Sequence, residues 1–283
     1  MIKNFVVKFL KSKGYSKTIK PYLNYHSTLN STEYILEKKQ SRTKVVELIQ
    51  KLTPYKTDKE LIRIGPEKDG GYLVPNDLEG IKACFSPGVS DESGFEKNCH
   101  KLGMEIYMAD ASVEKANLNV QHDFIKKFIG SFNNDTFITM DKWVEEKADK
   151  NGELLLQMDI EGAEYSSFLN MSDSLLERFR IMIIEFHDLQ KLWAEFPANI
   201  MSEVFTKILQ THTCVHIHPN NCCGFDIQEG VEIPRVAEFT FIRNERISTK
   251  ENIEKYPHPL DIDNTSYPTL ELPEIWYKPK QTK

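Results

Sequence analysis

Carboxylates and histidines follow two aliphatic runs of this sequence. Asp159 and Glu161 come after LLLQM, and Glu185 and His187 end the run IMIIEFH. Side chains two positions apart on an extended backbone point to the same side, so each pair could act on one ligand. Carboxylates and imidazoles accept protons or bind divalent cations. The spacing therefore predicts a site for proton transfer or metal binding at the ends of two strands.

A second histidine pair, His216 and His218 in VHIHP, repeats this spacing. With Glu185 and His187 it would offer four groups from neighbouring strand ends, enough to bind a divalent cation that lowers the pKa of an alcohol. His187 or His218 could instead be a general base, because imidazole titrates near neutral pH. Structural hydrogen bonding is the third interpretation, and these residues alone leave all three open.

A glycine and an aspartate mark the ends of the first two predicted strands, Gly88 and Asp110, which lie 22 positions apart. The glycine permits close backbone approach to a ligand, and the acid accepts hydrogen bonds from ribose hydroxyls. Dinucleotide enzymes and adenosylmethionine enzymes share both features. The turn SPGVSDESG, however, lacks the G-x-G-x-x-G spacing and contains Asp91 and Glu92, which would repel a pyrophosphate. It favours S-adenosylmethionine (SAM), whose sulfonium is positively charged.

The segments that would position these residues alternate between strands and helices over residues 81–243. Short apolar runs separated by helical periodicity are typical of a parallel sheet with helices on its faces. We expect strands in ACF, MEIYMAD, FIKKFIGS, LLL and IMII, and a closing antiparallel pair in TCVHIHP and VAEFTFIR. Ser93 and Glu96 form a predicted capping box for the first helix of this region. In such sheets, ligands bind beyond the carboxyl ends of the strands, where the residues described above are expected.

The segment LLLQMDIEGAEYSSF resembles the D-x-E-G-x-E signature of FkbM-type, class I SAM-dependent methyltransferases. RIGPEKDGGYLV, IIEFHDL and HIHPNN are similar to further parts of that family, so the resemblance covers residues 61–243. It implies a Rossmann-like α/β fold with a central, mostly parallel sheet, a reversed last strand and helices on both faces. It also implies SAM as the methyl donor, a hydroxyl as the methylated group, and a sugar or glycan as the acceptor.

Carried over to this sequence, the resemblance implies two sets of site residues. The SAM-binding set is Ser86, Gly88, Asp110, Ala111, Ser131 and Asp159, and the catalytic set is Asp159, Glu161, His187 and His218. Asp159 would serve as base, metal ligand or anchor for the SAM amino group. The turn DGGY implies that Tyr72 or Arg63 faces the cofactor or the acceptor. A divalent cation is an open addition to SAM, and no residue is assigned to it.

The composition limits the partners and the location. The 283 residues carry 36 basic and 42 acidic side chains, and the net charge of −6 disfavours nucleic acid as a partner. No apolar run reaches the roughly 20 residues of a membrane span. Five cysteines, mostly far apart, argue against a disulfide scaffold and favour a reducing, cytoplasmic location. Cys222 and Cys223 are not expected to bind zinc, because adjacent side chains diverge.

Three regions are expected along the chain: a helical extension over residues 1–60, a methyltransferase domain over 61–246, and an extended tail over 247–283 packed on that domain. Apolar residues at spacings of three and four, interspersed with lysines, predict an amphipathic helix over residues 2–10. Such a helix could contact an anionic membrane surface or a partner. Packing on its own domain is the simpler interpretation, and we favour it.

Two other classes of protein compete with the methyltransferase. An NAD-type oxidoreductase would use a similar fold, but the acidic, glycine-poor first turn disfavours it. A non-catalytic scaffold would bind a membrane or a partner through the basic N-terminal helix. The acids and histidines gathered at predicted strand ends argue against that scaffold, because a structural role does not require them.

Overall fold

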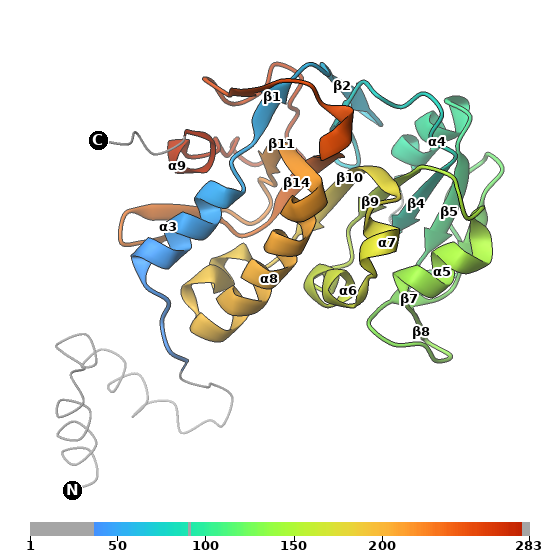
Figure 1. Ribbon diagram of the computed structural model, residues 1–283, viewed down its shortest axis with the longest axis horizontal. Coiled ribbons are helices and arrows are strands. Elements are labelled where there is room, and N and C mark those ends of the chain that lie inside the picture. The colour runs from blue at the N-terminus through green and yellow to red at the C-terminus, as the bar shows by residue number, and fades with distance from the viewer. Residues whose placement is uncertain (1–36, 90–91, 279–283) are drawn as a thin grey trace, which may run out of the picture. The chain divides into compact units, whose positions relative to one another are not determined.

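A computed structural model describes residues 37–89 and 92–278 (Figure 1). Residues from Lys38 onward form one compact unit. Residues 38–60 lie in the same unit as residues 61–246. The amphipathic helix expected over residues 2–10 lies outside the described residues. No helix in the described part of the chain combines the length and the apolar character needed to cross a membrane.

Seven strands form the central sheet, and one of them is reversed. They are β4 (Ala83–Pro87), β5 (Glu105–Ala109), β6 (Asp123–Ile125), β9 (Leu154–Met158), β10 (Phe179–Phe186), β11 (His212–Pro219) and β14 (Ala237–Arg243). Their order is β11-β14-β10-β9-β4-β5-β6, with β14 antiparallel to both of its neighbours. The predicted Rossmann-like α/β fold with a reversed last strand is confirmed.

Helices and short β pairs surround this sheet. The helices are α3 (Arg42–Lys51), α4 (Gly94–Lys101), α5 (Met140–Lys147), α6 (Glu164–Asn170), α7 (Asp173–Leu176), α8 (Glu195–Thr211), α9 (Glu274–Tyr277), and the 3-10 turns η1 (Leu189–Trp193) and η2 (Asn244–Arg246). The short pairs are β1 (Tyr55–Thr57) with β15 (Lys250–Asn252), β2 (Leu61–Ile64) with β3 (Tyr72–Pro75), β7 (Phe128–Ile129) with β8 (Phe137–Ile138), and β12 (Phe225–Gln228) with β13 (Val231–Pro234).

The sheet is covered on both faces because side chains alternate along its strands. In β9, Leu154 and Leu156 join one apolar core, and Leu155 joins a second one. The first core includes side chains of α3, α5, α6 and α8, whereas the second includes side chains of α4 and the β2–β3 hairpin. Unbroken aliphatic runs therefore form strands that are buried on both sides.

Two local sequence predictions were wrong. Ser93 precedes α4, but its side chain makes no capping hydrogen bond. Glu96 is buried and contacts Ser86 of β4 instead, so the interior of the domain outcompetes the capping box. The run FIKKFIGS is not one strand: β6 ends at Ile125, and Phe128–Ile129 pairs with β8 outside the central sheet.

The C-terminal tail packs against the first core. Tyr256 and Trp276 are buried there, and Trp276 Nε1 donates to the Glu232 carbonyl at 3.0 Å.

In the loop after β11, Cys222 and Cys223 are joined by a disulfide. The expectation that their side chains diverge was therefore wrong.

Candidate active site

Polar side chains replace apolar ones at the carboxyl ends of the central strands. Along β9, Leu155 belongs to the core beneath α4, and Gln157 and Asp159 follow it at intervals of two. Along β10, Ile183 of the same core is followed by Glu185. Residues two apart share a face, so the sheet face that is apolar at its centre becomes polar at this edge.

The reversed strand separates the two strand ends that were expected to share a cation. Glu185 lies in register with Glu238 of β14, and Glu238 lies in register with His218 of β11. His187 and His218 therefore do not meet across adjacent strands. Glu238 of β14 lies between the ends of β10 and β11 and is buried. Burial raises the pKa of Glu238 to about 8.

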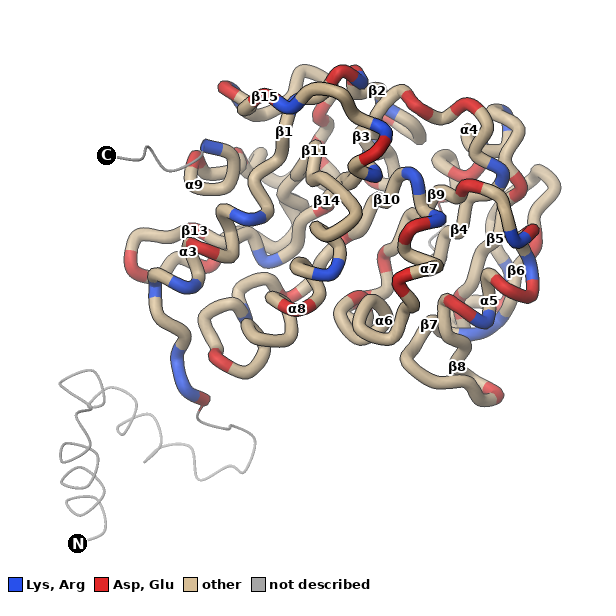
Figure 2. Tube along the Cα trace, in the orientation of Figure 1, with Lys and Arg blue, Asp and Glu red and all other residues tan. Residues whose placement is uncertain are grey.

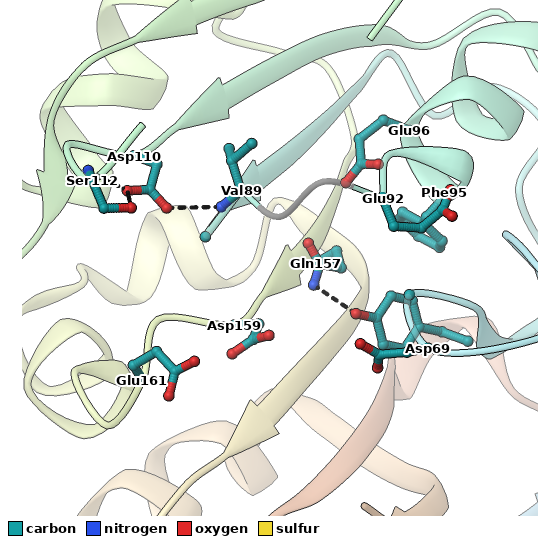
Figure 3. A pocket seen from close by; sticks show the side chains of 13 residues that line it. Asp69, Val89, Glu92, Phe95, Glu96, Asp110, Ser112, Gln157, Asp159 and Glu161 are labelled. Atoms are coloured by element: carbon teal, nitrogen blue, oxygen red, sulfur yellow. Dashed lines mark hydrogen bonds between the residues drawn. The ribbon is translucent and has the colours of Figure 1, made fainter. Parts of the chain in front are cut away.

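A cavity of about 210 Å³ opens at this edge of the sheet (Figure 3). Six carboxyl side chains, and no lysine or arginine, occur among the described residues that line it. It therefore suits a cation better than a phosphate. The lining residues are Asp69, Gly70, Tyr72, Gly88, Val89, Glu92, Phe95, Glu96, Asp110, Ser112, Gln157, Asp159 and Glu161.

Gly88 holds the first strand end against the fourth. Its φ is +89°, and a Cβ placed on it would lie 1.5 Å from the Asp159 carbonyl oxygen. The Asp159 amide donates to the Pro87 carbonyl at 3.2 Å across the same contact. Glycine is required here because two backbones touch, which differs from the close approach to a ligand that the sequence suggested.

Asp110 closes the turn that follows the first strand. Its Oδ2 accepts from the Val89 amide at 2.9 Å, and its Oδ1 accepts from the Ser112 amide at 2.6 Å (Figure 3). These bonds hold the carboxylate at the cavity wall. Ribose hydroxyls are the ligand groups that a carboxylate at this strand end accepts bonds from.

Ser86 lies beneath the cavity, in a buried network. Its Oγ is 2.5 Å from Glu96 Oε1 and 2.6 Å from Gln157 Oε1, and Gln157 Nε2 donates to the Tyr72 hydroxyl at 3.2 Å. A hydroxyl carries one proton, so both Ser86 contacts are satisfied when Glu96 is protonated. Burial raises the pKa of Glu96, in agreement with this assignment.

His187 is surrounded by carboxylates, two of which, Asp159 and Glu161, line the cavity. Its Nε2 lies 3.3 Å from Glu161 Oε2, 3.8 Å from Asp159 Oδ1 and 3.9 Å from Glu185 Oε1. Burial raises the pKa of Asp159 to about 6, although His187 opposes that rise. Burial lowers the pKa of His187, but the hydrogen bond that its Nδ1 donates to Glu164 and the nearby acids outweigh this effect and raise the pKa to about 9. Near neutral pH the pair is carboxylate and imidazolium.

Glu164 orients both the histidine and the acidic loop. Its Oε1 accepts from the Ile160 and Gly162 amides at 3.1 and 3.0 Å, and it lies 3.2 Å from His187 Nδ1. The loop that it holds is strained, because Glu161 has a φ of +55°. The third acid of the D-x-E-G-x-E segment is therefore a buried positioning residue.

The structure brings together part of the predicted site. Gly88, Asp110, Asp159 and Glu161 line the cavity, with His187 and Ser86 in direct contact with lining residues. Besides Ser86 and His187, three predicted residues are absent from the described lining: Ala111, which follows Asp110; Ser131, which is exposed after β7; and His218, which faces Asp261 of the tail.

Several residues of this region were missed by sequence reasoning. Gln157 lies in β9, two residues after Leu155 and two before Asp159. This spacing places it on the same face of the sheet as Asp159, and that was the signal available in the sequence. Asp261 and Asn264 come from the tail, and Asn264 Nδ2 donates to Asp69 at 2.9 Å and to Glu238 at 2.7 Å. No local pattern marks such tail contacts.

The distance among Asp159, Glu161 and His187 also meets a requirement of metal sites. Their ligand atoms lie within 4.8 Å of one another. Proton transfer and cation binding, which the sequence left open as alternatives, would therefore use the same three residues. His218 takes part in neither at this cavity.

Comparison with known proteins places this geometry in a family. Residues 72–211 match the methyltransferase FkbM domain. A search of solved structures finds the fibrillarin pre-rRNA processing protein of Methanococcus jannaschii, with 12% sequence identity and a TM-score of 0.35, covering 66% of this chain and 83% of that one. Among curated proteins no match is found. Residues 72–211, which contain Gly88, Asp110 and Asp159, belong to the methyltransferase FkbM family, and the chain is a SAM-dependent methyltransferase.

Proposed function

We propose that this enzyme transfers the methyl group of SAM to a hydroxyl oxygen of a sugar or glycan, with Asp159 as the proton acceptor. The observation that carries the proposal is the cavity that joins Gly88, Asp110 and Asp159. Asp110 would bind the ribose of SAM, and the lining carboxylates favour its sulfonium. The absence of lysine and arginine among the described lining residues disfavours a pyrophosphate, and with it the NAD-type alternative.

The transfer is an in-line displacement. The acceptor oxygen forms a bond to the methyl carbon, the bond from that carbon to the sulfonium sulfur breaks, and S-adenosylhomocysteine leaves. The acceptor hydroxyl loses its proton, which passes to the Asp159 carboxylate. His187, held by Glu164, supplies positive charge beside Asp159 and so keeps the carboxylate ionised at neutral pH.

A hydroxylated acceptor fits the groups around Asp159. Asp69, Gln157 and Glu161 line the same cavity and offer oxygen atoms that accept hydrogen bonds from sugar hydroxyls. Lysine and arginine positions are scattered over the described elements in Figure 2 rather than gathered on one of them. This distribution favours a small-molecule or glycan acceptor over nucleic acid.

A divalent cation is the second candidate for activating the acceptor. The spacing of Asp159, Glu161 and His187 supports it. Bound there, a cation would lower the pKa of the acceptor hydroxyl in place of a base. Methylation measured after EDTA treatment separates the two: retained rate supports the base, and a loss reversed by magnesium or manganese supports the cation.

Incubation with methyl-labelled SAM tests the proposal. A panel of sugar nucleotides and glycans is offered to the wild-type enzyme and to Asp159→Asn, which keeps the shape of the side chain but accepts no proton. We expect label in an alkali-stable methyl ether with the wild type only. Labelled carboxyl or amine groups, or equal activity of both proteins, would contradict the proposal.

A further inference from the structure

Two histidines of β11 and an aspartate of the C-terminal tail form a buried cluster outside the cavity. His216 Nε2 lies 2.8 Å from Asp261 Oδ1, and His218 Nδ1 lies 3.7 Å from the same oxygen. The side chains are 3%, 10% and 7% exposed in the order His216, His218, Asp261. None of the three is among the described residues that line the cavity. The proposed methyl-transfer step assigns none of the three a role.

The cluster has the donor set and the spacing of a metal site. One ligand atom from each residue lies within 4.8 Å of the other two. A tetrahedral zinc ion with bonds of about 2.0 Å to nitrogen and oxygen requires ligand atoms about 3.3 Å apart. The distance from Asp261 Oδ1 to His216 Nε2, 2.8 Å, is shorter than this value, and the distance from the same oxygen to His218 Nδ1, 3.7 Å, is longer. Two imidazoles and one carboxylate suit Zn²⁺ among the common biological cations, because magnesium and calcium prefer oxygen ligands alone.

The second observation concerns the ring nitrogen of His218 that does not face Asp261. His218 is buried, and no hydrogen-bond partner lies within normal bonding distance of its Nε2. Asn264 interacts with this histidine, and its Oδ1 is also buried without a partner. Metal-bound histidines usually donate their other ring N–H to an oxygen. If Nδ1 of His218 binds a metal, Nε2 carries the proton and Asn264 Oδ1 is the oxygen placed to accept it.

The remaining contacts hold the cluster in position. Asp261 Oδ2 accepts from the His258 amide at 2.8 Å, which leaves Oδ1 directed at the two histidines. The ring of His216 stacks on Tyr256, with centroids 5.7 Å apart. Both ends of the cluster are thus fixed by the tail, which contributes one of the three ligands.

We propose that His216, His218 and Asp261 bind one Zn²⁺ ion that fastens the C-terminal tail to β11. The ion would lie outside the lining of the methyl-transfer cavity. Its connection to that cavity is Asn264, three residues after Asp261, which donates to the lining residue Asp69. The inference rests on the cluster alone and is independent of the proposed acceptor.

Zinc titration of the full-length protein tests the proposal. Protein stripped with a chelator and dialysed is titrated with ZnCl₂ by calorimetry, and zinc in freshly purified protein is measured by elemental analysis. We expect about one zinc per chain. In Asp261→Asn an amide oxygen still accepts from His258, so the tail contact survives while the ligand charge is lost. Affinity should fall about 100-fold or more.

Matched variants locate the ion. His218→Gln should lose zinc as Asp261→Asn does, and it provides a second test if one variant does not fold. His258→Gln removes an imidazole next to the cluster, and His187→Gln removes the one at the cavity; both should bind zinc as the wild type does. Excess zinc should raise the Tm of the wild type but not of Asp261→Asn. A wild type without micromolar zinc binding, wild-type affinity in Asp261→Asn, or loss in His187→Gln alone would overturn the proposal.

Discussion

Asp159 is the residue to which the proposed reaction assigns the proton transfer. It lines the cavity, touches the turn around Gly88 through its backbone, and lies 3.8 Å from the His187 imidazole. One of its oxygens is buried without a hydrogen-bond partner. An acceptor hydroxyl entering the cavity would provide that partner, so the unsatisfied oxygen is consistent with a substrate contact.

The first prediction concerns the pH dependence of turnover. Only the ionised form of Asp159 accepts a proton, and its pKa is raised to about 6. We therefore expect kcat/KM to rise with pH through about 6 and to level off above it. A profile that rises through about 9 instead would identify His187 as the base, since its pKa is raised to that value.

Asp159→Asn should lower kcat by about 100-fold or more without changing the Tm by more than a few degrees.

A second prediction concerns Glu164, which acts through His187. Glu164→Gln keeps the amide contacts of the loop but removes the negative charge beside Nδ1, so the pKa of His187 should fall. NMR titration of the ring measures this directly. Glu145→Gln, on the exposed side of α5, should leave it unchanged. An unaltered His187 titration in Glu164→Gln would show that the carboxylate does not control the imidazole.

At the scale of elements, the ends of β4 and β9 form the frame of the site. The sequence predicted these strands because aliphatic runs buried on both faces are unbroken, and it placed the polar residues at their carboxyl ends by chain position alone. It failed for short or locally ambiguous segments. Ser93 and Glu96 have the spacing of a capping box, but Glu96 is buried and contacts Ser86. This contact joins α4 to β4, and a local sequence pattern cannot predict a contact between two elements.

A third prediction concerns the contact between Gly88 and the Asp159 carbonyl. Gly88→Ala would force a Cβ to within 1.5 Å of the Asp159 carbonyl oxygen, so the strand ends must separate. We expect a loss of about 3 kcal/mol or more in the free energy of unfolding, together with a loss of SAM binding. Gly103→Ala is the matched control. Gly103 has the same φ of +89°, but its Cβ would meet nothing within 4 Å.

Gly103→Ala should therefore cost only about 1 kcal/mol and preserve binding. Chemical denaturation of both variants provides the comparison. Equal destabilisation would mean that backbone strain, rather than the contact between β4 and β9, accounts for the glycine at position 88.

At the scale of the whole molecule, the C-terminal tail connects parts of the sheet that are distant in sequence. Asp261 reaches β11, and Asn264 reaches both β14 and the turn before β3. The aromatic content of the tail predicted that it packs on the domain, and Trp276 is fully buried. Its individual partners could not be predicted, because contacts between residues 26 or more positions apart leave no periodic pattern in the sequence.

The fourth prediction concerns acid stability and rests on His212, at the start of β11. Burial lowers its pKa from 6.5 to about 4, while its Nε2 lies 2.7 Å from the Phe179 carbonyl. The unfolded chain binds a proton below pH 6.5, whereas the folded chain does not until about pH 4. The stabilisation is therefore present above pH 6.5 and is lost as the pH falls to 4, about 3 kcal/mol in total.

Denaturant unfolding of the wild type and His212→Gln isolates this contribution from the other titrating groups. The difference in unfolding free energy between the two proteins should shrink by about that amount between pH 6.5 and 4. A difference that stays constant with pH would contradict the assignment of a neutral, buried imidazole.

The central claim is that the acidic cavity at the carboxyl edge of the sheet binds SAM. Calorimetric titration of the wild type, Asp110→Asn and the exposed control Asp135→Asn with SAM tests it most directly. We predict one SAM per wild-type chain, the same affinity in Asp135→Asn, and affinity lower by about tenfold or more in Asp110→Asn. A wild type that binds no SAM, or an Asp110→Asn variant that binds it as tightly as the wild type, would contradict the claim.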